Sequence, residues 1–192
     1  MALYSLFATV FDYPEAPLQE SLGCCMALLP PGASESYAQL AAFESAVRGK
    51  SSGQLQEIYT SAFDLHPDCT PNLGYHLFGD DGRRGLFLAE LKDRMEARHI
   101  PLGVELPDHI SLVLRYLDVA DEEDRLCLIG DCLIPALSRI AARFEQSGNP
   151  YRYVLQALLS LISYQHEELV ISPGAVVHHI AAQREAPFHI LE

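Results

Sequence analysis

Apolar residues recur along this chain at intervals of three and four, the spacing that places them on one face of an α-helix. No stretch shows the strict alternation of apolar and polar residues that is typical of a half-buried strand. The stripes are Leu3, Leu6, Phe7 and Val10; Leu18, Leu22, Cys25 and Leu29; Tyr37, Leu40, Ala41 and Val47; Leu55, Ile58, Tyr59 and Ala62; Leu88, Leu91 and Met95; Ile110, Val113, Leu114 and Leu117; Leu133, Leu137, Ile140 and Phe144; and Tyr151, Leu155, Leu158 and Ile162. The pattern predicts an all-α fold.

Short breaks lie between the stripes, and none is long enough to divide the chain into separate domains. We therefore expect a single-domain helical bundle over residues 1–192. The longest break is 66–85, and an unstructured connection of roughly 20 residues is uncommon in a compact domain and is usually functional. The tail beyond about residue 172 is thinly patterned and is expected to dock loosely or fray. The breaks fall at 30–32, 49–53, 66–85, 101–103 and 121–124.

Proline residues mark where several helices begin. Pro150 follows Asn149, so asparagine can cap a helix whose first position suits the fixed φ of proline. Pro135 is expected to start or kink the helix that contains Leu137. Pro107 is expected to open the helix that carries Ile110.

Length and composition fit one soluble domain with a proper core. The chain has 192 residues, of which 49% are hydrophobic and 20% charged, and this balance excludes a disordered chain. No window reaches the roughly 18 uninterrupted apolar residues of a membrane span, so no direct membrane insertion is expected. Lys and Arg total 13 against 26 for Asp and Glu, which gives a net charge of -13. That charge repels nucleic acid and favours a basic partner such as a cationic peptide.

The cysteines indicate a reduced, cytoplasmic setting. They number 5, contain no C-x-x-C pair and follow no secretory signal at the N-terminus. Cys25, Cys127 and Cys132 are expected to pack as small hydrophobic side chains.

Candidate chemistry concentrates in the segment from Glu105 to His109, which reads Glu-Leu-Pro-Asp-His. If Pro107 is the first helical position, Asp108 lies in the first turn, where its charge complements the helix dipole. An acid and an imidazole held together at a helix end could serve an enzyme or a peptide-binding site. The alternative is that Asp108 only stabilises its own helix start while Glu105 pairs with Arg84.

Other chemistries have weaker patterns. His66, His76, His109 and the pair His178-His179 lack the spacing of a metal site, so no metal and no permanent cofactor is expected. The segment 79–85 is rich in glycine and holds two arginines, but it matches neither phosphate-binding motif, and a turn leading into a helix is the favoured explanation. A small hydrolase using Asp108 and His109 as an acid-base pair stays open, although no nucleophile accompanies them.

Several of these elements occur together in one family. The chain contains Tyr59-x-x-x-Phe63-Asp64, His76-x-x-Gly79, Arg84-Gly85, and Glu105-Leu106-Pro107-Asp108-His109 followed by Leu112 to Leu117. In order and interval this region, from about Gln54 to Leu117, resembles the NarJ-type nitrate reductase assembly chaperones, within the broader group of TorD- and DmsD-type maturation proteins. The opening segment 6–14 is also similar to the family's start. One departure is Arg115, where the family commonly carries a glutamate.

The resemblance implies an all-α, single-domain bundle of the TorD/NarJ-like type that is a chaperone and not an enzyme. Such a protein binds the N-terminal segment of a molybdoenzyme catalytic subunit in the cytoplasm. It holds that subunit for insertion of the molybdenum cofactor and delays its membrane attachment or its twin-arginine export. The client can be a nitrate reductase or a related molybdenum oxidoreductase, regulatory GTP binding at 79–85 is an alternative addition, and a homodimer is possible. The residues that the resemblance assigns to client-peptide binding are Tyr59, Phe63, Asp64, His76, Arg84, Glu105, Asp108 and His109.

Overall fold

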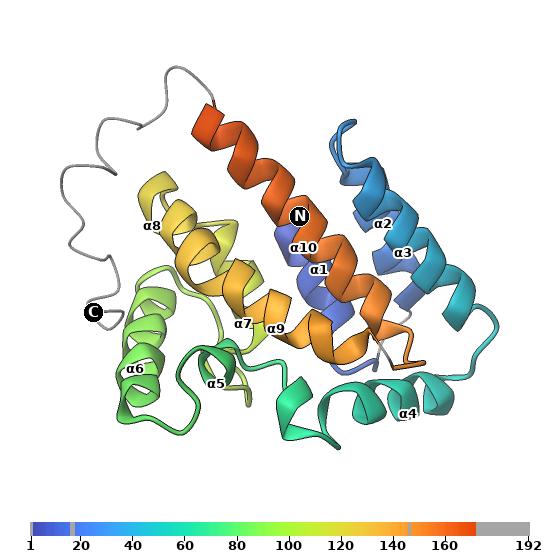
Figure 1. Cartoon of the computed structure of the whole chain (residues 1–192), viewed down its shortest axis with the longest axis horizontal. Helices are drawn as coiled ribbons and strands as arrows, with labels where there is room; N and C mark the ends of the chain where they lie inside the picture. Colours follow the sequence, from blue (N-terminus) through green and yellow to red (C-terminus); the bar gives the residue numbers. More distant parts are fainter. Residues whose placement is uncertain (1, 16–17, 146, 172–192) are drawn as a thin grey trace.

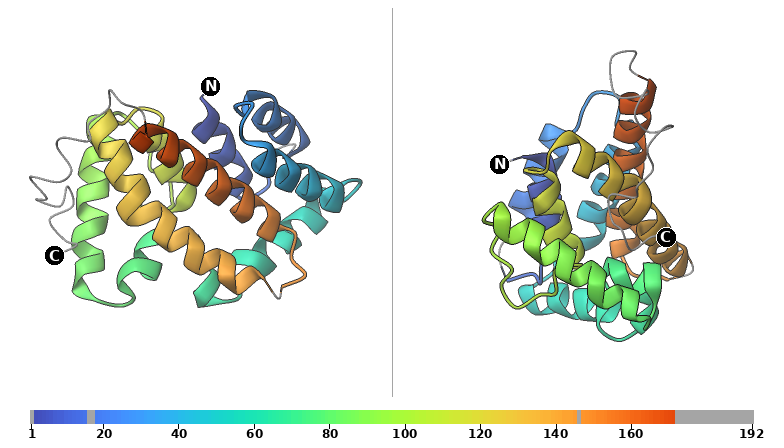
Figure 2. Two further views of the ribbon diagram at one scale, coloured as in Figure 1. Left: turned by 45° about the horizontal axis from the view of Figure 1, so that its top comes forward. Right: turned by 90° about the vertical axis from the view of Figure 1, so that its left-hand side faces the viewer.

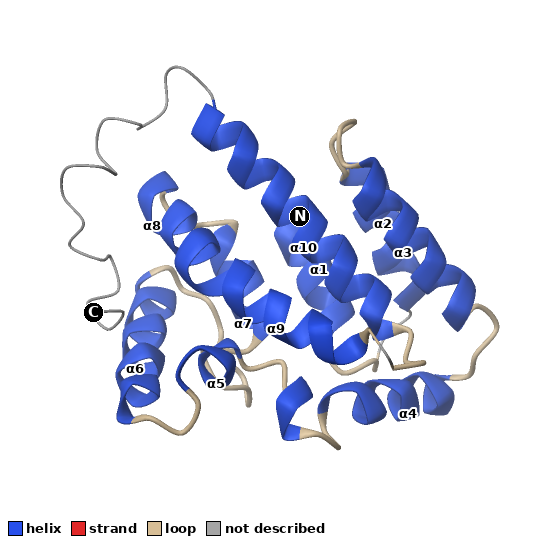
Figure 3. Cartoon of the chain, in the orientation of Figure 1, coloured by secondary structure: helices blue, strands red, loops and turns tan. Residues whose placement is uncertain are grey.

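A computed structural model describes residues 2–15, 18–145 and 147–171 of the chain. Over these ranges the all-α prediction is confirmed (Figure 3). Extended pairing within them is limited to one antiparallel bridge between Asn72 and His109. The expectation for the tail beyond 172, and the pair His178-His179, lie outside the described residues. The α-helices are α1 (Leu3–Phe11), α2 (Leu18–Leu28), α3 (Ser34–Val47), α4 (Ser52–Phe63), α5 (Leu73–Phe78), α6 (Gly82–Ala97), α7 (Ile110–Leu117), α8 (Glu122–Cys127), α9 (Ile134–Phe144) and α10 (Tyr151–Ile171); η1 (Pro67–Cys69) is a 3₁₀ turn and η2 (Leu128–Leu133) a π-helical turn.

The helices pack as two groups with α10 and α1 at their centres. Helix α10 contacts α9 and α3, and α1 contacts α7 and α2. Figure 1 shows α1 and α7 behind α10 and α9, while α4 and α5 run along the lower edge. The two further views in Figure 2 show the same arrangement turned. The contact between α1 and α7 is apolar. Phe7, Ala8 and Phe11 of α1 are fully buried, as are Val113 and Leu114 of α7.

An aromatic cluster fills the space where α4, α9 and α10 meet the end of α1. The Phe63 ring lies 4.9 Å from that of Tyr151, 5.1 Å from that of Tyr59 and 5.9 Å from that of Phe144, measured between centroids. The Tyr59 hydroxyl donates a hydrogen bond of 3.1 Å to the carbonyl oxygen of Phe11. Tyr59 and Phe63 are therefore core residues with little surface left for a ligand.

Two of the predicted helix starts have the expected chemistry. The side-chain oxygen of Asn149 accepts a hydrogen bond from the backbone amide of Tyr151 at 3.0 Å. The side-chain amide of Asn149 donates to the carbonyl of Ile58 at 2.9 Å. Asn149 thus caps α10 and also joins it to α4. Pro135 lies in the first turn of α9, directly after the π-helical turn η2. The chain is helical on both sides of this point, so Pro135, which has no amide hydrogen to donate, marks the change from π-helical to α-helical winding.

Two expectations about local structure are wrong. The segment 66–85 is not unstructured, because it holds η1, α5 and the start of α6. Its glycines and prolines mark the ends of short elements rather than one long loop. The second error concerns Pro107, which lies in a turn: His109 is the N-cap and α7 begins at Ile110. Asp108 therefore precedes the cap and does not lie in the first helical turn.

Polar contacts hold α1 against α7. Asp118 accepts hydrogen bonds from the amide of Ser5, at 2.7 Å, and from its hydroxyl. Arg115 forms a bidentate pair with Asp12, just beyond the end of α1. The arginine that departs from the family pattern thus has a carboxylate partner within this chain.

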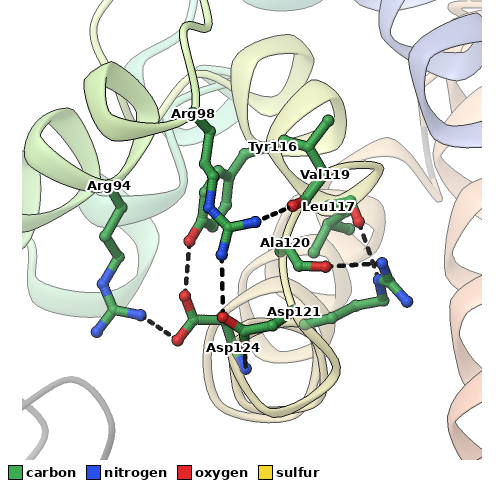
Figure 4. Close-up of polar contacts among 9 residues, drawn as sticks. Arg94, Arg98, Tyr116, Leu117, Val119, Ala120, Asp121 and Asp124 are labelled. Carbon is green, nitrogen blue, oxygen red and sulfur yellow. Dashed lines mark hydrogen bonds and ion pairs between the residues drawn. The ribbon is translucent and has the colours of Figure 1, made fainter.

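A second polar cluster fixes the corner where α7 turns into α8 (Figure 4). Arg94 of α6 pairs with Asp124 of α8, and the same carboxylate accepts a hydrogen bond of 2.7 Å from Tyr116. Arg125 donates to the carbonyls of Leu117 and Ala120, which lie at the C-terminal end of α7. Cations and donors there satisfy carbonyl groups that have no partner within the helix. The cluster therefore sets the angle between three helices.

Replacement of Tyr116 by phenylalanine keeps the buried ring and removes the hydroxyl donor to Asp124. We expect Tyr116→Phe to lower the free energy of unfolding by about 1–2 kcal/mol, because a hydrogen bond to a charged acceptor is lost. Urea unfolding followed by circular dichroism measures this. Tyr37→Phe is the matched control, since that tyrosine is 53% exposed on α3. Equal stability of the two variants would contradict a structural role for the cluster.

Candidate functional site

The carboxylate of Asp108 is fully buried and has three donors around it. The side-chain amide of Asn72 donates to it at 2.9 Å and the backbone amide of Gly74 at 3.1 Å. Arg84 of α6 supplies the opposite charge, 3.4 Å away. A buried charge persists only when it is paired and hydrogen-bonded. The donors come from Asn72 just before α5, from Gly74 in the first turn of α5 and from Arg84 of α6, so Asp108 joins α5 and α6 to the start of α7.

Backbone hydrogen bonds reinforce the same junction. The amide of Leu73 donates to the carbonyl oxygen of Asp108 at 2.9 Å. The amide of Ile110 donates to the carbonyl oxygen of Pro71, also at 2.9 Å. The residue at position 74 must also be small. A Cβ there would lie 2.8 Å from Oδ2 of Asp108 and 3.1 Å from the ring of Phe87. The close approach of α5 to Asp108 therefore depends on Gly74.

The guanidinium of Arg84 makes its contacts within this junction. Besides pairing with Asp108, its guanidinium lies 5.8 Å from the centre of the Tyr75 ring, in a cation-π arrangement. The side chain is only 23% exposed. The alternative considered from the sequence, a pair between Arg84 and Glu105, is not what the structure shows. The neighbouring Arg83 pairs with Asp81, the N-cap of α6.

His109 acts as the N-cap of α7. Its Nδ1 accepts a hydrogen bond from the amide of Ser111 at 3.2 Å and lies 2.8 Å from the Ser111 hydroxyl. The ring is buried. Burial is the main reason why the pKa of His109 falls to about 4; the charge of Asp12 opposes this fall, and the charge of Arg115 adds to it. At neutral pH the imidazole is therefore uncharged, and its cap holds the first turn of α7 in place.

His76 lies at the C-terminal end of α5 and is half-buried. Its Nε2 is 2.8 Å from the carbonyl oxygen of Thr70, which only accepts, so Nε2 carries the proton. Burial lowers the pKa of His76, opposed by its hydrogen bond to Thr70. The imidazole thus closes the turn that leads to Asn72, whose side chain accepts a hydrogen bond from the Thr70 hydroxyl at 2.8 Å.

Asp64 and Glu105 are the exposed members of the predicted set. Burial raises the pKa of Tyr59, and the charges of Asp64 and Glu105 add to that rise together with Tyr151 and Asp12. The charges of Asp64 and Glu105 therefore both act on the Tyr59 hydroxyl.

Exposed apolar side chains lie next to these acids in the chain. Leu65 follows Asp64 and is 63% exposed, and Val104 and Leu106 flank Glu105 at 99% and 47%. Tyr13, 44% exposed, packs edge-on against Tyr59. We call the set Tyr13, Asp64, Leu65, Val104, Glu105 and Leu106 the acidic-apolar surface.

The sequence did not single out Asn72 and Gly74, the residues that complete the Asp108 junction. The position of Gly74 was a weak indication, because a glycine among the apolar residues of a helix usually allows close packing against a neighbour. Asn72 left none, because its bond to Asp108 joins residues 36 positions apart. Metal chemistry gains no support: no group of three or more His, Cys, Asp or Glu that could hold an ion occurs in the part of the chain that the structure describes.

The acid and the imidazole of the central motif are thus enclosed within a helical protein and take part in its structure, while the exposed acids stand next to apolar side chains in the chain. The chain belongs to the nitrate reductase delta subunit family, whose family model matches residues 27–155. The resemblance inferred from the motifs is thereby confirmed. No helix among the described residues is long and apolar enough to cross a membrane.

Individual relatives carry a chaperone name. The chain is 29% identical over 107 residues to the nitrate reductase molybdenum cofactor assembly chaperone NarJ of Escherichia coli K12, covering 55% of this chain and 45% of that protein. It is 24% identical over 161 residues to the probable nitrate reductase molybdenum cofactor assembly chaperone NarJ of Bacillus subtilis 168, covering 83% of this chain and 87% of that protein. The chain thus spans about half the length of the Escherichia coli relative.

The close packing at Gly74 gives a sharp test of the junction. Gly74→Ala places a Cβ 2.8 Å from Asp108, so we expect a loss of roughly 1–3 kcal/mol in the free energy of unfolding through overpacking. Gly85→Ala is the control, because position 85 is exposed on α6 and has nothing within 4 Å of the added Cβ. We expect it to stabilise by about 0.5–1 kcal/mol, the usual gain of alanine over glycine in a helix. Urea unfolding of both variants decides, and a neutral Gly74→Ala would contradict the tight junction.

The pKa of His109 predicts a pH dependence of stability. In the unfolded chain His109 titrates near 6.5, whereas its folded pKa is about 4. Between these values only the unfolded chain binds the proton, so stability is complete above about pH 6.5 and falls as the pH drops toward 4. The full loss in the free energy of unfolding, reached below pH 4, is about 3–3.5 kcal/mol. Urea midpoints measured from pH 7.5 to 4.5 should show this fall.

The control for the pH experiment is His109→Asn. Asparagine can still cap α7 but does not titrate, so the stability of this variant should depend less on pH over the same interval. His76 and the carboxylates titrate in both proteins, and the difference between the two curves isolates His109. Parallel curves would overturn the assignment of a buried, neutral His109.

Proposed function

We propose that this protein is a chaperone for assembly of a molybdoenzyme, and that it binds the N-terminal segment of the enzyme's catalytic subunit in the cytoplasm. Membership of the nitrate reductase delta subunit family supports the proposal, as do relatives named as nitrate reductase molybdenum cofactor assembly chaperones. In this proposal the catalytic subunit is held while its cofactor is inserted, and no bond is made or broken by the chaperone. A homodimer stays a prediction.

The observation that carries the proposal is the acidic-apolar surface. A segment with basic and apolar residues can pair with Asp64 and Glu105 while its apolar side chains cover Leu65 and Leu106. The net charge of -13 attracts such a segment and increases its rate of association. Ordering the segment costs conformational entropy, so binding needs both kinds of contact.

Within this proposal the predicted site residues divide into three groups. Asp64 and Glu105 contact the client. Arg84, Asp108 and the imidazoles of His76 and His109 position the loop and helix ends that present the surface. Tyr59 and Phe63 form its aromatic support.

The alternative functions have no observation in their favour. A hydrolase would need Asp108 and His109 open to substrate, yet both are buried and hydrogen-bonded within the protein. GTP binding at 79–85 would need free arginines, but Arg83 pairs with Asp81 and Arg84 with Asp108. A turn leading into α6 explains that segment.

Titration calorimetry with a synthetic N-terminal peptide of the nitrate reductase catalytic subunit from the same cell tests the proposal. We expect saturable binding, with Asp64→Asn and Glu105→Gln each weakening it about three- to tenfold, equal to roughly 0.7–1.4 kcal/mol for exposed charge contacts. Affinity should also fall with added salt. The control is Glu35→Gln, which removes the same charge in the first turn of α3 and should change the dissociation constant less than twofold.

Equal losses in all three variants would indicate a general charge effect and would contradict the assigned surface. Absence of binding to the wild-type chain would contradict the function itself. A separate expectation applies to Asp108→Asn, which should unfold more easily because Arg84 loses its partner at a buried junction.

A further inference from the structure

A hollow of about 370 Å³ opens between the end of α4, the turn η1 and the end of α9. Its size is at the low end of the roughly 300–1,000 Å³ that is typical of ligand pockets. Its exposed lining is about half apolar and half polar: Ala62 and Phe144 take part in it but are each only 2% exposed, and Ser61, His66, Asp68 and Arg143 supply polar groups. The function proposed so far assigns no role to this hollow.

The hollow adjoins the acidic-apolar surface. Asp64 and Leu65 lie in the chain between Ala62 and His66, both of which line the hollow. A bound segment that contacts Asp64 therefore passes close to its mouth. The apolar half of the lining can contact one aliphatic or aromatic side chain, and such an anchor often carries much of the affinity of a segment.

Asp68 and Arg143 form a loose ion pair in the lining. Their charged atoms are 3.7 Å apart and both side chains are 62% exposed, so the pair contributes little to stability. A carboxylate in such a pair can exchange its partner at low cost. Arg143 thus occupies a position that a basic side chain from outside could take.

We propose that the hollow is the anchor site of the client segment: it receives one apolar side chain, and a neighbouring arginine or lysine of the segment replaces Arg143 at Asp68. The inference rests on the proposed function and adds to it a specific pocket and a competing internal cation. The charge of the protein favours this occupant, because Asp68, Asp64 and the net charge of -13 attract a basic segment and repel a small anion. Arg143 then acts as an internal competitor that weakens the binding of clients.

The chain contains no tryptophan, so a tryptophan in the peptide is the only one in the complex. The probe is the N-terminal peptide of the nitrate reductase catalytic subunit, in a set in which each large apolar residue in turn is replaced by tryptophan. At one position we expect the emission to shift to the blue on binding, because the indole leaves water. The Ser61→Phe variant fills the hollow and should abolish that shift and weaken binding about tenfold.

Ser52→Phe is the matched control for the filling variant. Ser52 is exposed on the same helix α4 and does not line the hollow, so this variant should bind the peptide within about twofold of the wild type. Circular dichroism of both variants checks that α4 is intact.

The competing cation is tested by charge substitutions. Arg143→Gln should tighten peptide binding about two- to fivefold, and Asp68→Asn should weaken it by a similar factor. Arg48→Gln controls for the change in net charge, since Arg48 also pairs with a carboxylate at 3.7 Å but lies at the end of α3. A larger gain for Arg143→Gln than for Arg48→Gln supports the exchange of partners at Asp68.

The outcomes separate the two proposals. If the peptide binds, depends on Asp64 and Glu105, but shows no blue shift and no response to Ser61→Phe, the anchor site is overturned and the chaperone function stands. Equal gains for Arg143→Gln and Arg48→Gln overturn the competition at Asp68. If the wild-type chain binds no peptide, both proposals are overturned.

Discussion

The structure depends on the enclosure of one charge, the carboxylate of Asp108. Because it is fully buried, its pairing with Arg84 and its hydrogen bonds from Asn72 and Gly74 are obligatory rather than incidental. These bonds fix α5, α6 and α7 relative to one another. The loop that carries Glu105 is therefore presented from a rigid junction, which limits the conformational entropy that this loop would lose on binding a segment.

The helical content and the family could be predicted from the sequence, because both depend on local patterns. Spacing of apolar residues sets the helices, and Asn149 with Pro150 marks the start of α10. The motif around Asp108 was equally visible, but its role was not. Whether an acid faces solvent or the interior depends on contacts between distant residues, such as the bond from Asn72, and no local pattern records them.

The same limit explains the expectations that failed. Proline suits a first helical position, yet Pro107 lies in a turn because His109 caps α7 through Ser111. Glycine and proline at high density suggested a long loop over 66–85, whereas short helices end and begin there. Local propensity indicates where the chain can break, and tertiary packing decides how much structure lies between the breaks.

The π-helical turn η2 between α8 and α9 is the form that a helix takes when it accommodates one surplus residue. One residue corresponds to a rotation of about 100° in an α-helix. In regular α-helical winding, the surplus residue would rotate α8 by that angle relative to α9 and move Arg125 away from the carbonyls at the end of α7. The wider turn absorbs the residue and keeps the two helices in phase, so the winding between Asp124 and Pro135 is as much a constraint on this fold as the identity of either residue.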